Sequence, residues 1–221
     1  MIKNLVCEPF QEIVDKGALP QRFGEGLTFF IPKGERQAVE IQKWRPITIL
    51  NTIYKILAKL ISLHLQPMLP QLIHVSQKGF IKERSILDNL ATFWELTALA
   101  EKRKETLAVL MLDFEKAYDR VDWDFLHGTL LCFGFEEGWI RGIEASLYST
   151  ATSRVLLNGQ KGPSIQLTRS VRQGCLLAPF LFLFYAKAIC TYLNHMSIGL
   201  KGISLPITES VALDAEFVDD T

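Results

Sequence analysis

Two adjacent aspartates, Asp219 and Asp220, follow the apolar pair Phe217-Val218 near the end of the sequence. Neighbouring carboxylates repel each other, so a cation or solvent has to screen them. An apolar pair followed by such aspartates is typical of a tight turn that presents carboxylates at the tip of a hairpin. Most turns of this kind are simply solvated, and a metal site therefore requires a further carboxylate.

A third carboxylate, Asp113, directly follows an unbroken apolar run at residues 107–112. This run predicts a strand that is buried on both faces. A carboxylate at the end of such a strand is costly to ionise without a partner. If the two strands are neighbours, Asp113 and Asp219 meet and offer the oxygen ligands that Mg²⁺ prefers. Since a pair of such ions performs in-line phosphoryl transfer, the pattern predicts polymerase chemistry.

The charges are unevenly distributed along the chain. Lys and Arg together number 24, as do Asp and Glu, so the net charge gives no overall signal for nucleic acid. Residues 1–104 hold 15 basic and 10 acidic residues, whereas residues 105–221 hold 9 and 14. A basic region joined to an acidic one suits a protein that holds phosphates on one side and metal on the other. The alternative interpretation is an ordinary fluctuation of segment charge.

Four cations stand at ordered positions in the basic region. Lys33 follows a predicted strand at 27–32, and Arg45 precedes one at 47–50, so both emerge from neighbouring strand ends. Lys55 and Lys59 lie one turn apart on one face of a predicted helix at 51–68, which Asn51 or Thr52 can cap. Template phosphates or water could lie along that face.

Gln173 and Gly174 form a predicted turn behind a hairpin signal, in which segments 154–157 and 164–167 flank residues 158–162. Glycine lets the backbone approach a ligand, and a glutamine amide can hydrogen-bond a sugar or a base. Asp119, Asp122 and Asp124 could also be interpreted as additional carboxylates of a metal site. We interpret them instead as capping and charging the positive end of the next helix.

The remaining pattern is one of alternating strands and helices. Apolar periodicity, caps and breakers predict helices at 3–16, 51–68, 86–104, 123–133, 139–148 and 179–193. The stretch 175–193 has Lys187 as its only charge and is long enough for a membrane span. Pro179 and the preceding turn favour a buried helix of a globular core. The four cysteines and four histidines lack metal-ligand spacing, and no signal peptide is evident, which predicts reduced thiols in an intracellular protein.

Several blocks resemble, in order, the reverse transcriptases of non-LTR (LINE-type) retrotransposons, in a plant-like form. Residues 112–123 (LDFEKAYDRVDW) resemble the first catalytic motif, residues 170–175 (SVRQGC) through Pro179 the second, and residues 217–220 (FVDD) the aromatic-x-Asp-Asp box. Residues 30–33 (FIPK) and 44–47 (WRPI) resemble the fingers motifs of this family. Residues 76–80 (SQKGF) and 84–89 (RSILDN) follow them in the expected order.

This resemblance implies an α+β, right-hand polymerase fold with an antiparallel sheet backed by helices. Residues 1–104 would be a fingers-like basic region and residues 105–221 a partial palm, truncated after the aromatic-x-Asp-Asp box. The implied activity is RNA-directed DNA polymerisation on an RNA template and DNA primer with deoxynucleoside triphosphates. The implied site is as follows: catalytic Asp113, Asp219 and Asp220; Mg²⁺, with Mn²⁺ as an alternative, at these three and Phe114; nucleotide at Lys33, Arg45, Tyr118, Gln173 and Gly174; nucleic acid at Lys55 and Lys59.

The resemblance also implies a sugar gate at Tyr118, whose ring would clash with a 2′-hydroxyl; the alternative is an ordinary packing tyrosine. Some positions depart from the family: Leu176, Ala178 and Val218 replace the usual Pro, Ser and Ala, and Ser170 stands where Gly is common. The expected location is the nucleus and cytoplasm, without a membrane partner. Two alternatives stay open: an inactive truncated remnant that at most binds nucleic acid, and an RNA-templated RNA polymerase, against which Tyr118 argues.

Overall fold

The computed structural model describes residues 17–32 and 39–193 without a gap, and also 11–13, 15, 34, 195, 199, 202–204, 211, 212 and 215. Its contacts divide the chain into two compact units. The first unit comprises Met1–Leu63 and Tyr118–Ala178, and the second comprises His64–Ala117 and Pro179–Thr221. The units are interleaved along the sequence, so they do not coincide with 1–104 and 105–221. The assignment of those two ranges to fingers and palm stays a prediction.

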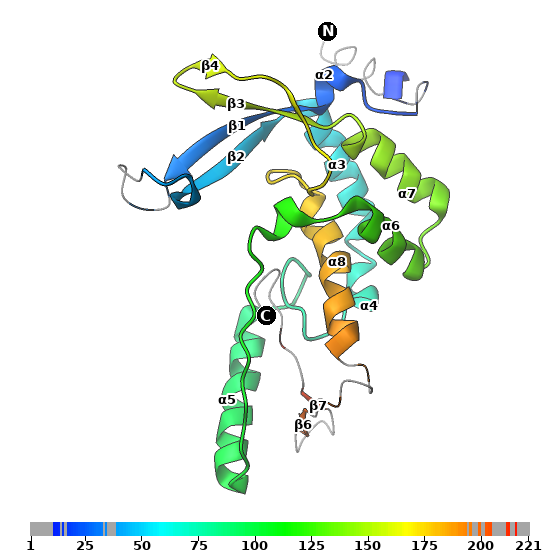
Figure 1. Cartoon of the computed structure of the whole chain (residues 1–221). Helices are drawn as coiled ribbons and strands as arrows, with labels where there is room; N and C mark the ends of the chain where they lie inside the picture. Colours follow the sequence, from blue (N-terminus) through cyan, green and yellow to red (C-terminus); the bar gives the residue numbers. More distant parts are fainter. Residues whose placement is uncertain are drawn as a thin grey trace. The chain divides into compact units, whose positions relative to one another are not determined.

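The first unit contains a sheet with the strand order β2-β1-β3-β4, and β5 also pairs with β3 (Figure 1). The strands are β1 (Glu25–Pro32), β2 (Trp44–Leu50), β3 (Thr152–Leu157), β4 (Gln160–Lys161) and β5 (Ile165–Gln166). β1 and β2 are antiparallel, whereas β1 and β3 are parallel. The α+β class and both predicted strands are confirmed, but the sheet is mixed rather than wholly antiparallel. The predicted hairpin is also confirmed, since β4 and β5 both run antiparallel to β3.

Helices and short turns complete the first unit. They are α2 (Gln21–Gly24), η1 (Ile41–Lys43), α3 (Thr52–Leu65, up to Leu63 in this unit), η2 (Ala117–Arg120), α6 (Trp123–Cys132), α7 (Glu137–Ile143) and η3 (Glu144–Tyr148). Two predicted caps are present: the Asn51 carboxamide oxygen accepts from the Ile53 amide at 2.9 Å, and the Asp122 carboxylate accepts from the Phe125 amide at 2.9 Å. Each cap satisfies an amide that has no partner inside its helix.

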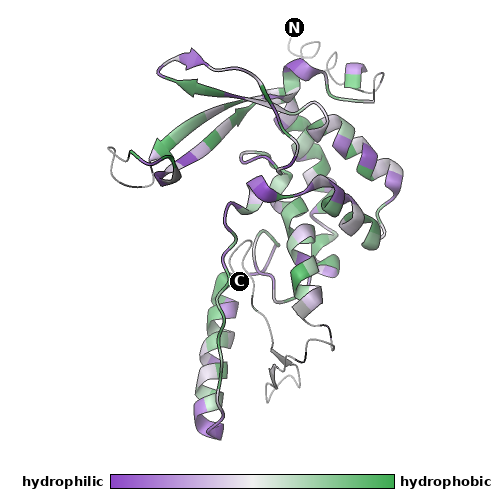
Figure 2. Cartoon of the chain, in the orientation of Figure 1, coloured by the Kyte–Doolittle hydropathy of each residue, from purple (hydrophilic) through white to green (hydrophobic). Residues whose placement is uncertain are grey.

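The second unit contains α4 (Leu69–Leu72), α5 (Ile86–Arg103), most of α8 (Ala178–Leu193) and the pair β6 (Ile203–Ser204) and β7 (Val211–Ala212). A capping box formed by Ser85 and Asp88 begins α5. Figure 2 shows the apolar character of α8, and Phe182 and Phe184 on it are fully buried. This agrees with the buried helix predicted there. Within the described residues, no helix combines the length and the apolar character that a membrane crossing requires.

The predicted buried strand at 107–112 is wrong. These residues form no strand, and Leu110 and Met111 are 79% and 81% exposed. Asp113 makes an isolated β-bridge, and in the described part of the chain no strand ladder continues from it. An apolar run shows that a segment can be buried, but a buried strand also needs neighbours that pair with its backbone.

Candidate functional site

Arg172 binds the central elements of the first unit together. Its side chain is buried, and its guanidinium donates to the Gly24 carbonyl at 2.5 Å and to the Thr152 carbonyl at 2.8 Å. The guanidinium also lies over the Tyr54 ring, 5.4 Å from its centroid. Burial lowers the pKa of Arg172 from its ordinary value. Gly26 provides the space, because a Cβ there would collide with the guanidinium.

This arrangement fixes the turn that follows Arg172. Gly174 has a φ of +91°, which favours glycine, and a Cβ there would meet the Thr48 carbonyl oxygen at 2.9 Å. The predicted turn is therefore confirmed, but the close approach that requires glycine is to β2, a packing role that the sequence interpretation did not include. The Val171 amide donates to the Tyr118 carbonyl at 2.9 Å, which places Tyr118 beside this turn.

Asp119 has a different role from the one predicted for it. Its carboxylate accepts from the Gln173 amide nitrogen at 3.5 Å, and both residues line the same pocket. Among the three aspartates, it is Asp122 whose side chain caps α6, and Asp124 lies in the first turn of that helix. Asp119 differs because it belongs to η2, a separate short turn before the cap, and so it faces the Gln173 turn.

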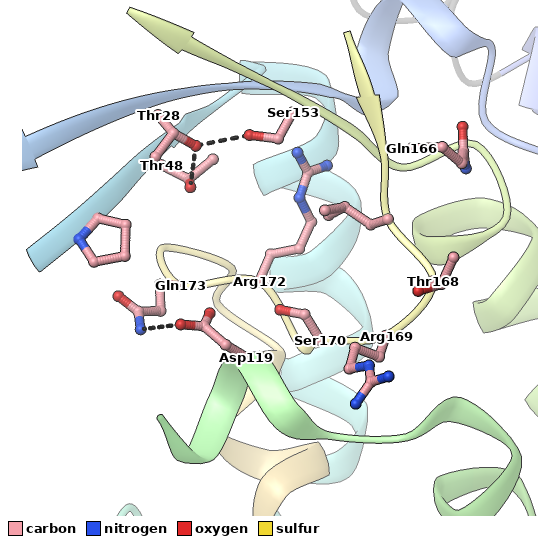
Figure 3. A pocket seen from close by; sticks show the side chains of 12 residues that line it. Thr28, Thr48, Asp119, Ser153, Gln166, Thr168, Arg169, Ser170, Arg172 and Gln173 are labelled. Atoms are coloured by element: carbon pink, nitrogen blue, oxygen red, sulfur yellow. Dashed lines mark hydrogen bonds between the residues drawn. The ribbon is translucent and has the colours of Figure 1, made fainter. Parts of the chain in front are cut away.

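The pocket has a volume of about 340 Å³ and lies between the sheet and the segment 166–173 (Figure 3). Three hydroxyl groups from three strands form a connected row on its sheet side. The Thr28 hydroxyl lies 2.9 Å from that of Thr48 and 2.7 Å from that of Ser153. Figure 3 shows Gln173 and Asp119 pointing toward each other at the opposite side of the pocket.

The nucleotide-binding set predicted from sequence is only partly brought together. Tyr118, Gln173 and Gly174 are adjacent, and Tyr118 is half-buried. Arg45 is exposed on β2, where side chains alternate between the two faces, and its neighbours Pro46 and Thr48 line the pocket. Arg45 therefore lies on the sheet face opposite the pocket. Lys33 lies outside the described residues.

On α3, Lys55 is half-buried and Lys59 is exposed, one turn apart as predicted. In the second unit, the Asp113 carboxylate is exposed and makes no hydrogen bond or ion pair with any residue that the structure describes. The ring of Phe114 packs edge-on against Phe182, with centroids 5.9 Å apart, and so anchors the backbone beside Asp113.

The predicted metal site extends beyond the described residues, because Asp219 and Asp220 lie outside them. Within the described part of the chain, no group of three or more His, Cys, Asp or Glu side chains could hold a metal ion. An exposed carboxylate on an anchored backbone fits the oxygen ligand that a hard divalent cation needs. Asp113 thus suits the role of one of the three carboxylates predicted to bind metal.

Sequence reasoning missed Arg172, Asp119 and the row of hydroxyls. Arg172 was visible only as part of a motif, and its two carbonyl partners lie 148 and 20 residues away in sequence. The three hydroxyls come from separate strands, so no local pattern joins them. The alternation of β1 and β2 could have placed Thr28 and Thr48 on one face once their pairing was known.

Comparison with known proteins supports the resemblance. The sequence profile of the family described as "Reverse transcriptase (RNA-dependent DNA polymerase)" matches residues 31–205. This stretch includes Asp113 and the Gln173-Gly174 turn and ends before Asp219. Because the match covers most of the chain, the chain belongs to the reverse transcriptase family.

Relatives from retrotransposons place it with the non-LTR type. It is 34% identical over 210 residues to the transposon TX1 uncharacterized 149 kDa protein of Xenopus laevis, covering 95% of this chain and 16% of that protein. It is 29% identical over 168 residues to a Pol polyprotein from the type-1 retrotransposable element R2 of Popillia japonica, covering 76% and 23%. It is 24% identical over 219 residues to the RNA-directed DNA polymerase from mobile element jockey of Drosophila melanogaster, covering 96% and 22%. The chain thus spans at most about a quarter of these relatives, and a plant-like affiliation stays a prediction.

A solved structure shares the fold. The structure of apo telomerase from Candida tropicalis, truncated from its C-terminal domain, aligns with a TM-score of 0.55 at 17% identity. The alignment covers 99% of this chain and 48% of that one. At this identity the likeness concerns the fold alone, and it agrees with the fold expected from the sequence.

Proposed function

We propose that this chain is the nucleotide-adding region of a non-LTR retrotransposon polymerase that copies RNA into DNA, in the nucleus and the cytoplasm. The family match over residues 31–205 carries this proposal, because it encloses both Asp113 and the Gln173-Gly174 turn. The reaction joins the primer 3′-hydroxyl to the α-phosphate of a deoxynucleoside triphosphate and releases pyrophosphate.

The chemistry is proposed to depend on three carboxylates. Asp113, Asp219 and Asp220 would hold two Mg²⁺ ions, or Mn²⁺ as an alternative, with Phe114 beside them. When bound, such ions make the primer hydroxyl a better nucleophile and stabilise the charge that develops on the leaving pyrophosphate. Asp113 is suited to this role because its carboxylate is exposed and its backbone is anchored through Phe114 and Phe182.

The other residues would bind and select the substrates. Lys33 and Arg45 would hold the triphosphate, and Lys55 and Lys59 would contact phosphates of the RNA template or DNA primer. Gln173, on the turn fixed by Arg172, would hydrogen-bond the nucleotide, and Tyr118 beside it would exclude a 2′-hydroxyl. The contact between the Val171 amide and the Tyr118 carbonyl supports a shared position for these two groups.

Primer extension by the full-length protein tests the proposal. The assay uses an RNA template, a DNA primer and Mg²⁺, and compares wild type with Asp113→Asn. We expect Asp113→Asn to abolish extension and the matched control Asp124→Asn, at the start of α6, to leave it largely intact. A wild-type protein that binds the primer–template but never extends it would support the inactive remnant. Preferential incorporation of ribonucleotides would support the RNA-templated RNA polymerase.

A further inference from the structure

Hydrogen bonds join the chain before α6 to the turn that contains Gln173. The Val171 amide donates to the Tyr118 carbonyl at 2.9 Å. The Ser170 amide donates to the Val121 carbonyl at 2.8 Å. The two backbones are therefore held together over several residues. Side chains that project from one backbone toward the other meet in a defined geometry, which is what a binding site requires of its supporting residues.

The side chains of Asp119 and Gln173 come from these two backbones and point toward each other (Figure 3). The Gln173 side-chain nitrogen donates to the Asp119 carboxylate at 3.5 Å. An ionised carboxylate only accepts hydrogen bonds, so it selects the NH2 end of the amide rather than the oxygen end. The Gln173 Oε1 atom is therefore directed away from Asp119, and it accepts no hydrogen bond from the residues that the structure describes.

The orientation of the Gln173 amide decides which group of a nucleotide it can bind. A triphosphate offers only acceptor oxygens, whereas a sugar hydroxyl or a base amino group offers a donor. An amide oxygen directed at the nucleotide therefore binds the sugar or the base. The NH2 group in its place would face the same donor and form no hydrogen bond, so an amide held the wrong way round loses affinity.

From these features we propose that Asp119 is a positioning residue for nucleotide addition. Its carboxylate holds the Gln173 amide so that the oxygen faces the incoming nucleotide, and it acts through Gln173 rather than by touching the reacting atoms. The inference rests on the proposed function, because that function assigns Gln173 to the nucleotide. Asp122, and not Asp119, caps α6, so a substitution of Asp119 leaves the helix cap in place.

Exchanging the two side-chain groups tests the proposal in primer extension by the full-length protein. Gln173→Glu alone places two carboxylates together, and their repulsion should raise the KM for dATP about tenfold. Asp119→Asn alone lets the amide adopt either orientation and should raise the KM about twofold. The double variant Asp119→Asn, Gln173→Glu keeps the net charge and again directs an oxygen at the nucleotide. It should return the KM to within about threefold of wild type, with kcat changed by less than about twofold in all three variants.

An exposed pair with the same chemistry provides the matched control. The Gln11 side-chain nitrogen donates to the Asp15 carboxylate at 2.9 Å on the protein surface. Asp15→Asn, Gln11→Glu and their combination should leave the KM for dATP unchanged. If Asp119 served folding alone, the losses would accumulate, and the exchanged pair would be worse than either single variant. That result, or a wild-type KM in Gln173→Glu, would overturn the proposal.

A binding measurement separates this inference from the proposed function. A primer that ends in a dideoxynucleotide cannot be extended, so the affinity of its complex with RNA template and protein for dATP reports binding without chemistry. The three variants should weaken this affinity in the same order as they raise the KM, and the exchanged pair should recover it. If wild type binds dATP but extends no primer, the proposed function fails, while recovery in the exchanged pair still decides the role of Asp119. If wild type extends primers and the exchanged pair does not recover, the inference alone fails.

Discussion

Arg172 in the first unit and Arg84 in the second both use a guanidinium to gather backbone carbonyls, but they do so in different surroundings. Arg172 is 3% exposed and joins carbonyls that lie 148 and 20 residues away. Arg84 is half-buried and donates to four carbonyls within 14 residues of itself. Burial lowers the pKa of both groups.

The four carbonyls around Arg84 are those of Pro70, Ile73, His74 and Gln77, at 3.1, 3.0, 2.6 and 2.9 Å. They belong to α4 and the loop that follows it, so Arg84 shapes a local segment, whereas Arg172 joins the end of α2 to β3. The number of hydrogen bonds is therefore a poor guide to how much each arginine contributes to folding stability. The cost in folding stability depends on whether each carbonyl faces water or protein once the arginine is removed.

The largest effect should come from Arg172→Met. This substitution removes the guanidinium donor from two buried carbonyls, and at about 1–3 kcal/mol for each lost donor we expect the free energy of unfolding to fall by about 4 kcal/mol. Urea unfolding followed by circular dichroism measures it. The exposed Arg141→Met should change stability by less than about 0.5 kcal/mol. A loss as small as that of the control would show that Arg172 does not hold the unit together.

Arg84→Met should have a smaller effect although it removes twice as many hydrogen bonds. Water can reach several of the released carbonyls, so we expect a loss of about 2 kcal/mol in the same unfolding assay. Hydrogen exchange of amides at 70–84 should quicken, while exchange in β1 and β3 should not. A loss greater than that of Arg172→Met would reverse the comparison.

Ser170→Gly should stabilise the protein. A serine at φ +100° is strained, and glycine adopts this conformation without a steric cost, so we expect a gain of about 1 kcal/mol. The midpoint of thermal unfolding should rise. Ser164→Gly, at an exposed loop position, should give no gain. A decrease at position 170 would mean that the serine side chain contributes more than the strain costs.

The sequence predicted those features that local chemistry determines. Asn51 and Asp122 were expected as caps, and each accepts an amide within three residues. The hairpin around Asn158 and the turn at Gly174 follow from residues that tolerate positive φ. The family's motif order supplied the fold class, which local patterns alone left as alternating strands and helices.

Contacts between distant segments could not be predicted in the same way. The parallel pairing of β1 with β3 and the reach of Arg172 to Gly24 depend on how the chain returns to itself. Asp119 was assigned to a helix start because the neighbouring aspartates fit one, yet it faces Gln173. The catalytic role of Asp219 and Asp220 and the nucleotide-binding role of Lys33 stay predictions.

The smallest effect is expected where the sequence prediction was wrong. Leu110 and Met111 are exposed, so Leu110→Lys and Met111→Lys in this 221-residue chain should change the free energy of unfolding by less than about 0.5 kcal/mol. Leu130→Ala is the control, because Leu130 is 2% exposed and its truncation should cost about 2–5 kcal/mol. If residues 110 and 111 were instead part of a buried strand, a lysine at either position would have to take its charge out of water, at a cost of several kcal/mol. Urea unfolding of the three variants therefore distinguishes an exposed environment from a buried one. A large loss of unfolding free energy from either lysine substitution would support the buried strand predicted from the sequence.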